Sequence, residues 1–250
     1  MSKKQVVEST FRDGVRKIIL NRPEKKNAFN KYMYQKLTQI LKEDSQDDNV
    51  VLTIITGTGD FYSSGNDFKT NMEDVSSMDD IQKFVEAFIE YPKIIIAVLN
   101  GPAIGIAATT LALCDIVYAS DRAYLETPFV RRGLCAEGTS SFMFPRILGR
   151  SKASEALLLA KKITSQDAYR LGFISAVIPH EQLPGFIESL YQYGSLSVNT
   201  IKINKRLAME HVKKQLLRAS QMEFEQLLEC IASEEFSQIL GEMVKNKSKL

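Results

Sequence analysis

Two glycine-rich loops carry the residue types best suited to chemistry on a carbonyl group. One spans residues 57–68 (GTGDFYSSGNDF) and the other residues 100–106 (NGPAIGI). Glycine lets backbone approach a ligand closely, and the start of a helix presents N–H groups that have no partner within the helix. Two such donors aimed at one oxygen would form an oxyanion hole, which stabilises charge that develops on that oxygen. On residue types alone, ordinary turns after strands are the commoner explanation.

Other catalytic chemistries find less support in the sequence. The two histidines, His180 and His211, lack HExxH or HxxxH spacing, so a histidine-based metal centre is not predicted. Cys114, Cys135 and Cys230 are widely spaced and form no CxxC pair, which argues against a disulfide framework and a thiolate metal site. No GxSxG segment is present, so a serine nucleophile is not indicated either. We therefore expect no metal.

The elements around the two loops predict how the loops are positioned. Residues 50–56 and 94–99 are continuous apolar runs, typical of buried strands, and each leads into one loop. A short helix is expected from near Gly105 to Leu113, which would place Ile106 at its N-terminus.

The remaining pattern divides the chain into an α/β half and a helical half. Further strands are expected at residues 6–11, 15–20, 116–119, 124–126 and 173–177, and helices at 31–41 (after a cap at Asn30), 78–91, 152–160, 165–171, 181–196 and most of 200–244. The alternation of strands and helices in the first half favours an α/β core. The helical remainder would pack on this core or on a neighbouring subunit.

Composition places the chain among ordinary globular proteins. Of its 250 residues 44% are apolar and 25% charged, and the net charge of +2 predicts no bulk attraction to nucleic acid or membranes. No stretch approaches the roughly 20 apolar residues that span a bilayer, and the first ten residues lack the apolar core of a secretory signal. The final tripeptide, Ser248-Lys249-Leu250, matches a peroxisomal address that is read by an import receptor. We therefore expect a peroxisomal matrix protein.

A set of motifs in a fixed order identifies a family. NRP at 21–23, NAF at 27–29, IITG at 54–57, FYSSGND at 61–67, NGPA at 100–103 and CDI at 114–116 resemble the enoyl-CoA hydratase/isomerase (crotonase) superfamily. The match runs from about residue 6 to about residue 177. The resemblance implies a crotonase-like spiral of ββα turns in residues 1–196, a helical trimerisation region in residues 197–250, and a homotrimer or dimer of trimers.

The same resemblance implies the chemistry of the two loops. Family members bind a coenzyme A thioester as substrate, need no separate cofactor, and hold the thioester oxygen between two backbone N–H groups. By motif those donors are Ser64 and Ile106. Because backbone supplies both donors, neither side chain is required, and Ser64 is not expected to act as a nucleophile.

The position of the carboxylate separates the reactions of the family. A hydratase uses two glutamates, and the matching places here hold Thr109 and Phe129, which disfavours hydration. Segment 133–138 resembles the Pro-Glu-Gly segment of peroxisomal-type Δ3,Δ2-enoyl-CoA isomerases, with Ala136 in place of the usual proline. Glu137 would then be the single base that takes a proton from C2 and returns it at C4. An apolar pocket should raise its pKa, which suits both steps.

The substrate-binding residues follow from the resemblance alone. The CoA moiety is expected near Lys25, Asn27, Ala28 and Phe29, and the thioester and pantetheine path near Ser64, Gly65, Asn66, Asp67 and Phe68, with Phe129 facing the acyl chain. Lys25 and its neighbour Lys26 are equally well explained as a solvated charged loop. Asp67 is alternatively explained as the cap of a following helix.

The favoured hypothesis is isomerisation of cis or trans 3-enoyl-CoA to trans-2-enoyl-CoA in the β-oxidation of unsaturated fatty acids. One alternative is another crotonase-type reaction, such as hydration or thioester hydrolysis. The other is a module that binds acyl-CoA without catalysis. Glu137 distinguishes the first hypothesis from the last, because a binding module needs no base.

Overall fold

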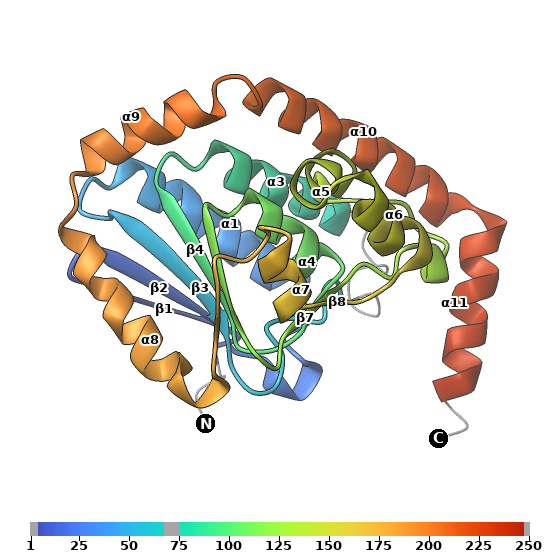
Figure 1. Ribbon diagram of the computed structural model, residues 1–250. Coiled ribbons are helices and arrows are strands. Elements are labelled where there is room, and N and C mark those ends of the chain that lie inside the picture. The colour runs from blue at the N-terminus through green and yellow to red at the C-terminus, as the bar shows by residue number, and fades with distance from the viewer. Residues whose placement is uncertain (1–4, 68–75, 248–250) are drawn as a thin grey trace.

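A six-stranded sheet with the order β1-β2-β3-β4-β6-β9 runs through the centre of the molecule (Figure 1). The computed structural model describes residues 5–67 and 76–247. Strands β1 and β2 are antiparallel to each other, and all other neighbouring strands in this sheet are parallel. The strands are β1 (Val7–Arg12), β2 (Val15–Leu20), β3 (Leu52–Gly57), β4 (Ile94–Leu99), β6 (Ile116–Ser120) and β9 (Ala176–Ile178).

Because successive side chains of a strand point to opposite faces, the strands present apolar side chains on both faces of this sheet. Leu52 and Ile54 of β3 share one apolar cluster with Leu183 and Leu190, which belong to α8 (Leu183–Ser189) and the 3-10 turn after it. Ile55, on the opposite face of β3, belongs to the main core. The helices α1 (Lys31–Gln46) and α3 (Ser76–Glu90) pack against each other and supply that core.

Local signals at the element ends match the expectations from sequence. Asp13 and Gly14, both at positive φ, form the β1–β2 turn. The side chain of Asn30 accepts a hydrogen bond of 3.0 Å from the N–H of Met33 and so caps α1. The strand predicted at 173–177 is β9, shifted toward the C-terminus.

After β4 the chain contributes three short strands to a small second sheet. It has the order β5-β7-β8, formed by β5 (Ala103–Ile104), β7 (Tyr124–Glu126) and β8 (Ile163–Thr164). Strand β8 was not predicted, because two residues carry no readable alternation. Directly after β5 comes α4 (Ile106–Thr109), which continues as a 3-10 turn over Thr110–Leu113.

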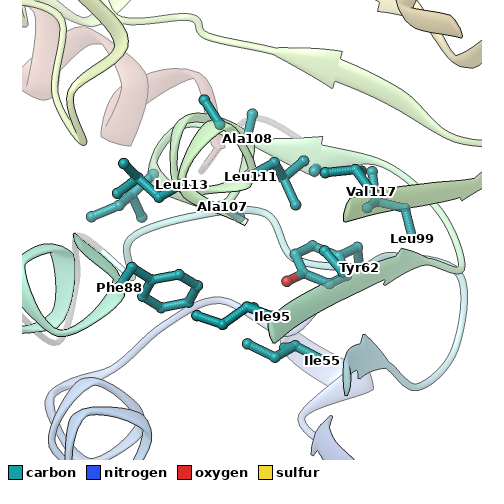
Figure 2. Packing of buried hydrophobic residues seen from close by; sticks show 14 of the residues in the cluster. Ile55, Tyr62, Phe88, Ile95, Leu99, Ala107, Ala108, Leu111, Leu113 and Val117 are labelled. Carbon is teal, nitrogen blue, oxygen red and sulfur yellow. The ribbon is translucent and has the colours of Figure 1, made fainter. Parts of the chain in front are cut away.

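The short helix α4 is held by the main core. Ala107, Ala108 and Leu111 share one buried cluster with Tyr62 and Ile95 (Figure 2). The alanines have almost no exposed surface, so the helix backbone lies close to the strands beneath it. This packing fixes the N-terminus of α4 relative to the end of β4.

The C-terminal half is helical, as predicted, with more breaks than the pattern suggested. Its helices are α5 (Ser140–Leu148), α6 (Arg150–Leu159), α7 (Ser165–Arg170), α9 (Val198–Met209), α10 (Lys213–Ala232) and α11 (Glu234–Lys247). The long expected helix at 200–244 is three helices, and Ser233 marks one break by accepting a hydrogen bond of 3.1 Å from the N–H of Phe236. In Figure 1, α9 and α10 arch over the molecule, and α10 contacts α3 and α5. Among the described residues, no helix has the length and apolar content needed to cross a membrane.

Candidate active site

Glu137 lies in the turn that leads into α5. Its carbonyl oxygen accepts hydrogen bonds from the backbone N–H of Ser140 at 3.2 Å and from its hydroxyl at 2.7 Å. Burial, followed by the negative charge of Glu223, raises the pKa of Glu137 to about 8, while Arg132 acts in the opposite direction. The side chain nevertheless keeps part of its surface accessible. A carboxyl group in this state can both accept and release a proton near neutral pH.

Thr109 connects the Glu137 turn to α4. Its hydroxyl donates to the carbonyl of Ile106 at 3.2 Å, and the residue is fully buried. A Cβ atom added to Gly138 would lie 2.3 Å from this hydroxyl oxygen, so the backbone of Gly138 lies directly against the side chain of Thr109. The place at which the family resemblance puts a hydratase carboxylate is therefore filled by a packed threonine that contacts the residue after Glu137.

The two glycine-rich loops lie against each other, as the sequence predicted. Ser63 pairs with Ala103 in a parallel bridge, and the N–H of Ile104 donates to the carbonyl of Ser63 at 3.0 Å. A Cβ atom on Gly65 would lie 2.5 Å from the carbonyl oxygen of Ile104. The backbone at residues 64–65 is thus adjacent to the backbone that enters α4.

Ile106 occupies the first position of α4, where an N–H has no partner within the helix. Within the described part of the chain, this N–H donates to no backbone carbonyl. Gly105 precedes it with φ 58° and ψ −130°, a conformation that residues with a side chain rarely adopt. The conformation of this glycine therefore sets the direction of the Ile106 N–H.

Ser64 differs from the expectation of a free donor. Its N–H donates to the carbonyl of Lys26 at 2.9 Å. Lys26 has a φ of 52°, which turns its carbonyl toward the loop and was not foreseen from sequence. The oxyanion role of Ser64 remains a prediction, and it requires that this hydrogen bond be shared or released when a thioester oxygen arrives.

Tyr34 of α1 is a neighbour of the site that the sequence did not single out. The residue is fully buried, and its hydroxyl donates to the side-chain oxygen of Asn66 at 3.3 Å. Burial raises the pKa of Tyr34 well above its usual value, and the negative charges of Glu137 and Asp67 add to this effect. The hydroxyl is therefore a neutral hydrogen-bond donor between the first loop and the Glu137 turn.

Asp67 forms an ion pair with Arg22 of the NRP motif. The carboxylate accepts from the guanidinium at 2.6 Å, and the same guanidinium donates to the carbonyl of Ala28 at 3.0 Å. Both side chains are mostly buried. The pair explains a structural part of the role of Asp67, whereas the predicted capping and the predicted contact at Phe68 involve chain outside the described residues.

The segment expected near coenzyme A is largely inaccessible. Asn27 has no exposed surface, and its amide donates to the carbonyls of Thr58 and Phe61 at 2.9 and 2.7 Å. Phe29 and Ala28 are also buried, and Phe29 packs against the ring of Tyr34. Their buried side chains therefore stabilise the conformation of this loop. Of the four predicted CoA contacts, only Lys25 is exposed.

Phe129 lies next to the start of α4 but is almost fully buried. The nearest heavy atom to a Cβ built on Gly105 is a ring carbon of Phe129, at 3.9 Å. The ring shares an apolar cluster with Leu134, Leu227 and Phe236. It contributes apolar packing beside the second loop, and little of its surface remains accessible for the predicted contact with an acyl chain.

Glu223 and Arg132 are the other two residues that sequence reasoning missed. Glu223 lies on the buried stripe of α10, which also contains Leu216, Ser220 and Leu227. A carboxylate on the buried stripe of a helix is a sequence signal of a buried partner. For Arg132, in the 3-10 turn Val130–Arg132, no comparable signal exists.

A cavity of about 530 Å³ lies between the end of α3 and helices α9 and α10, away from Glu137. No group of three His, Cys, Asp or Glu side chains in residues 5–67 and 76–247 could hold a metal ion.

The chain is similar to known proteins in both sequence and structure. A model of the family described as enoyl-CoA hydratase/isomerase matches residues 10–245. The chain is 41% identical over 249 residues to enoyl-CoA delta isomerase 3, peroxisomal, of Mus musculus, covering 96% of this chain and 78% of that protein. It is 40% identical over 250 residues to enoyl-CoA delta isomerase 2 of Rattus norvegicus, again over 96% of this chain, but spans only 64% of that protein. A crystal structure of an enoyl-CoA hydratase/isomerase from Pseudoalteromonas atlantica T6c superimposes with a TM-score of 0.92 at 29% identity, covering 97% of this chain and 98% of that one.

Proposed function

Because this chain belongs to the enoyl-CoA hydratase/isomerase family, we propose that it isomerises 3-enoyl-CoA to trans-2-enoyl-CoA with Glu137 as its single proton carrier. The similarity to the delta isomerases of mouse and rat supports an enoyl-CoA isomerase. The observation that carries the proposal is the position of Glu137, a partly buried carboxyl whose turn packs against Thr109 of α4, the helix that begins at Ile106. Its raised pKa, about 8, is consistent with a proton carrier.

In the proposed mechanism, the ionised carboxylate of Glu137 removes a proton from C2 of the substrate. The electron pair of the broken C–H bond delocalises onto the thioester oxygen and forms a dienolate. The N–H of Ile106, joined by that of Ser64 once it is released from Lys26, would stabilise this charge; losing one such donor typically costs about 3–4 kcal/mol. The protonated Glu137 then delivers the proton to C4, which moves the double bond to C2–C3 and restores the carboxylate.

The surroundings of Glu137 support this reaction over hydration. A hydratase needs a second carboxylate to position water, and Thr109 and Phe129 cannot take that role. Thr109 is buried and bonded to the carbonyl of Ile106, and Phe129 belongs to an apolar cluster. One titrating carboxyl is sufficient for a shuttle between two carbons of the same substrate.

The test is a direct assay with 3-hexenoyl-CoA. We expect the purified protein to produce the conjugated 2-enoyl-CoA, followed by its ultraviolet absorbance, and Glu137→Gln to abolish the reaction. Glu181→Gln, at an exposed site, is the matched control and should keep the wild-type rate. An unchanged rate in Glu137→Gln would refute the mechanism. Dominant addition of water to 2-enoyl-CoA would refute the isomerase assignment.

Two further properties complete the proposal. The printed name of the mouse relative supports a peroxisomal location, for which the predicted address is Ser248-Lys249-Leu250, outside the described residues. The family resemblance supports a homotrimer or dimer of trimers. Imaging of a fluorescent fusion with and without the tripeptide tests the first property, and light scattering of the purified protein tests the second.

A further inference from the structure

Glu223 of α10 contacts the chain on both sides of Glu137. Its carboxylate accepts hydrogen bonds from the N–H of Thr139 at 2.6 Å and from the N–H of Ser141 at 2.8 Å. Its own carbonyl oxygen accepts from the thiol of Cys135 at 3.7 Å. The segment from residue 135 to residue 141, with Glu137 near its middle, is thus attached at three points to one turn of α10, which runs beside α5 in Figure 1.

The turn held by Glu223 is strained. Thr139 has a φ of 65°, a left-handed conformation that is costly for a β-branched residue. Such conformations persist where the surrounding contacts enforce them. Here the enforcing contact is the hydrogen bond from the Thr139 N–H to the Glu223 carboxylate, because without it this N–H would be buried without a partner.

The carboxylate of Glu223 is also well placed to remain ionised. It is only 7% exposed, but it faces two N–H donors at the N-terminus of α5, where an anion is favoured. Burial raises the pKa of Glu223 above its ordinary value, and the hydrogen bonds offset part of this effect. Of the two neighbouring carboxyls, Glu223 has the backbone donors, and these favour its ionised form.

We propose that Glu223 is a positioning residue for Glu137: its carboxylate fixes the turn that carries Glu137 and, when ionised, places a negative charge beside it. This inference rests on the proposed isomerase function. The charged and titratable groups facing Glu137 are Glu223 from α10, Arg132 from the 3-10 turn and Tyr34 from α1. Arg132 opposes the effect of Glu223, and Tyr34 remains neutral.

Two variants separate the charge of Glu223 from its geometry. Glu223→Gln removes the charge and turns one acceptor into a donor that faces a backbone N–H. Glu223→Asp keeps the charge but is too short to reach both N–H groups in the same way. Glu229→Gln, at an exposed position of the same helix, is the control. The titration of Glu137 is followed by NMR of protein labelled with ¹³C at the glutamate carboxyls, with its signal assigned from Glu137→Gln.

We expect the Glu137 midpoint to move to lower pH in Glu223→Gln and to stay near the wild-type value in Glu223→Asp. In both variants kcat for 3-hexenoyl-CoA should fall roughly 10- to 100-fold with little change in KM, because a misplaced base slows the chemical step. Glu229→Gln should change neither quantity. A merely structural role of Glu223 would leave the midpoint unmoved.

An unchanged midpoint in Glu223→Gln, or full kcat in Glu223→Asp, would overturn the inference. Should Glu223→Gln fail to fold, Glu223→Asp decides by its kcat and midpoint alone. If the wild-type protein lacks isomerase activity, the proposed function fails, while the NMR midpoints still decide whether Glu223 controls the protonation of Glu137.

Discussion

A proton carrier that works on two carbons in turn must hold its proton neither too tightly nor too weakly. At Glu137, desolvation raises the pKa to about 8 with the help of Glu223, and Arg132 limits the rise. The protein thereby tunes one side chain through three elements that are distant in sequence. Such tuning has a cost in folding free energy, and this cost depends on pH.

The pH dependence of stability tests the raised pKa without any substrate. Between the ordinary glutamate value of 4.5 and about 8, the folded state keeps a proton on Glu137 that the unfolded state releases. The contribution of Glu137 to stability therefore falls as pH rises through this window, by at most about 1.4 kcal/mol per unit, and is constant above it. Glu137→Gln does not titrate, so its free energy of unfolding relative to wild type should increase from pH 5 to pH 8.

Urea unfolding of both proteins at several pH values gives this difference directly. Glu229→Gln controls for the loss of a carboxylate elsewhere. Parallel stability curves for wild type and Glu137→Gln would mean that Glu137 titrates as an ordinary exposed glutamate.

The strand–loop–helix connection from β4 to α4 is the element that positions the second loop. A Cβ built on Gly105 would meet its nearest heavy atom at 3.9 Å, an ordinary van der Waals contact, but at a φ of 58° that residues with a side chain rarely adopt. Gly105→Ala should therefore cost about 1–3 kcal/mol from backbone strain and not from a clash. As the backbone relaxes, the Ile106 N–H no longer points in its original direction. We therefore expect kcat to fall roughly 10- to 100-fold.

Gly172→Ala is the matched control for this element. Gly172 also has a positive φ, 78°, and no heavy atom within 4 Å of the added Cβ, so an alanine there is likewise strained without a clash. It follows α7 and lies far along the chain from both loops. Thermal melting and kinetics of both variants should show a loss of stability in each, with a loss of kcat only in Gly105→Ala. Equal kcat values would argue against a role of the Ile106 N–H.

Elements with a clear period were predictable, and contacts between elements were not. The apolar runs before both loops and the cap at Asn30 led to β3, β4 and α1, and the motifs led to Glu137. The hydrogen bond from Ser64 to Lys26 depends on one left-handed residue that lacks a glycine signal. Glu223 contacts the Glu137 turn from a helix more than 80 residues further along the chain. Only the packing of that helix determines which of its residues lies beside the turn.

At the scale of the molecule, the C-terminal helices are joined to the α/β half by buried side chains. Leu216 of α10 belongs to the main core, and Leu227 with Phe236 encloses Phe129 beside the second loop. Each of these large side chains would cost about 2–5 kcal/mol to remove from a core. Their sum is comparable to the whole stability of a typical domain, about 5–15 kcal/mol.

A chain that ends after residue 196 should therefore not behave as an independent domain. We expect it to lose the cooperative thermal transition of the full chain and to bind an apolar dye, because the surfaces of α3 and α5 that α10 covers become exposed. It should also lack activity, since the Glu137 turn loses the hydrogen bonds from Thr139 and Ser141 to Glu223. A cooperative transition within a few degrees of the full chain would instead make residues 197–250 a separable appendage, whose main role would then be assembly.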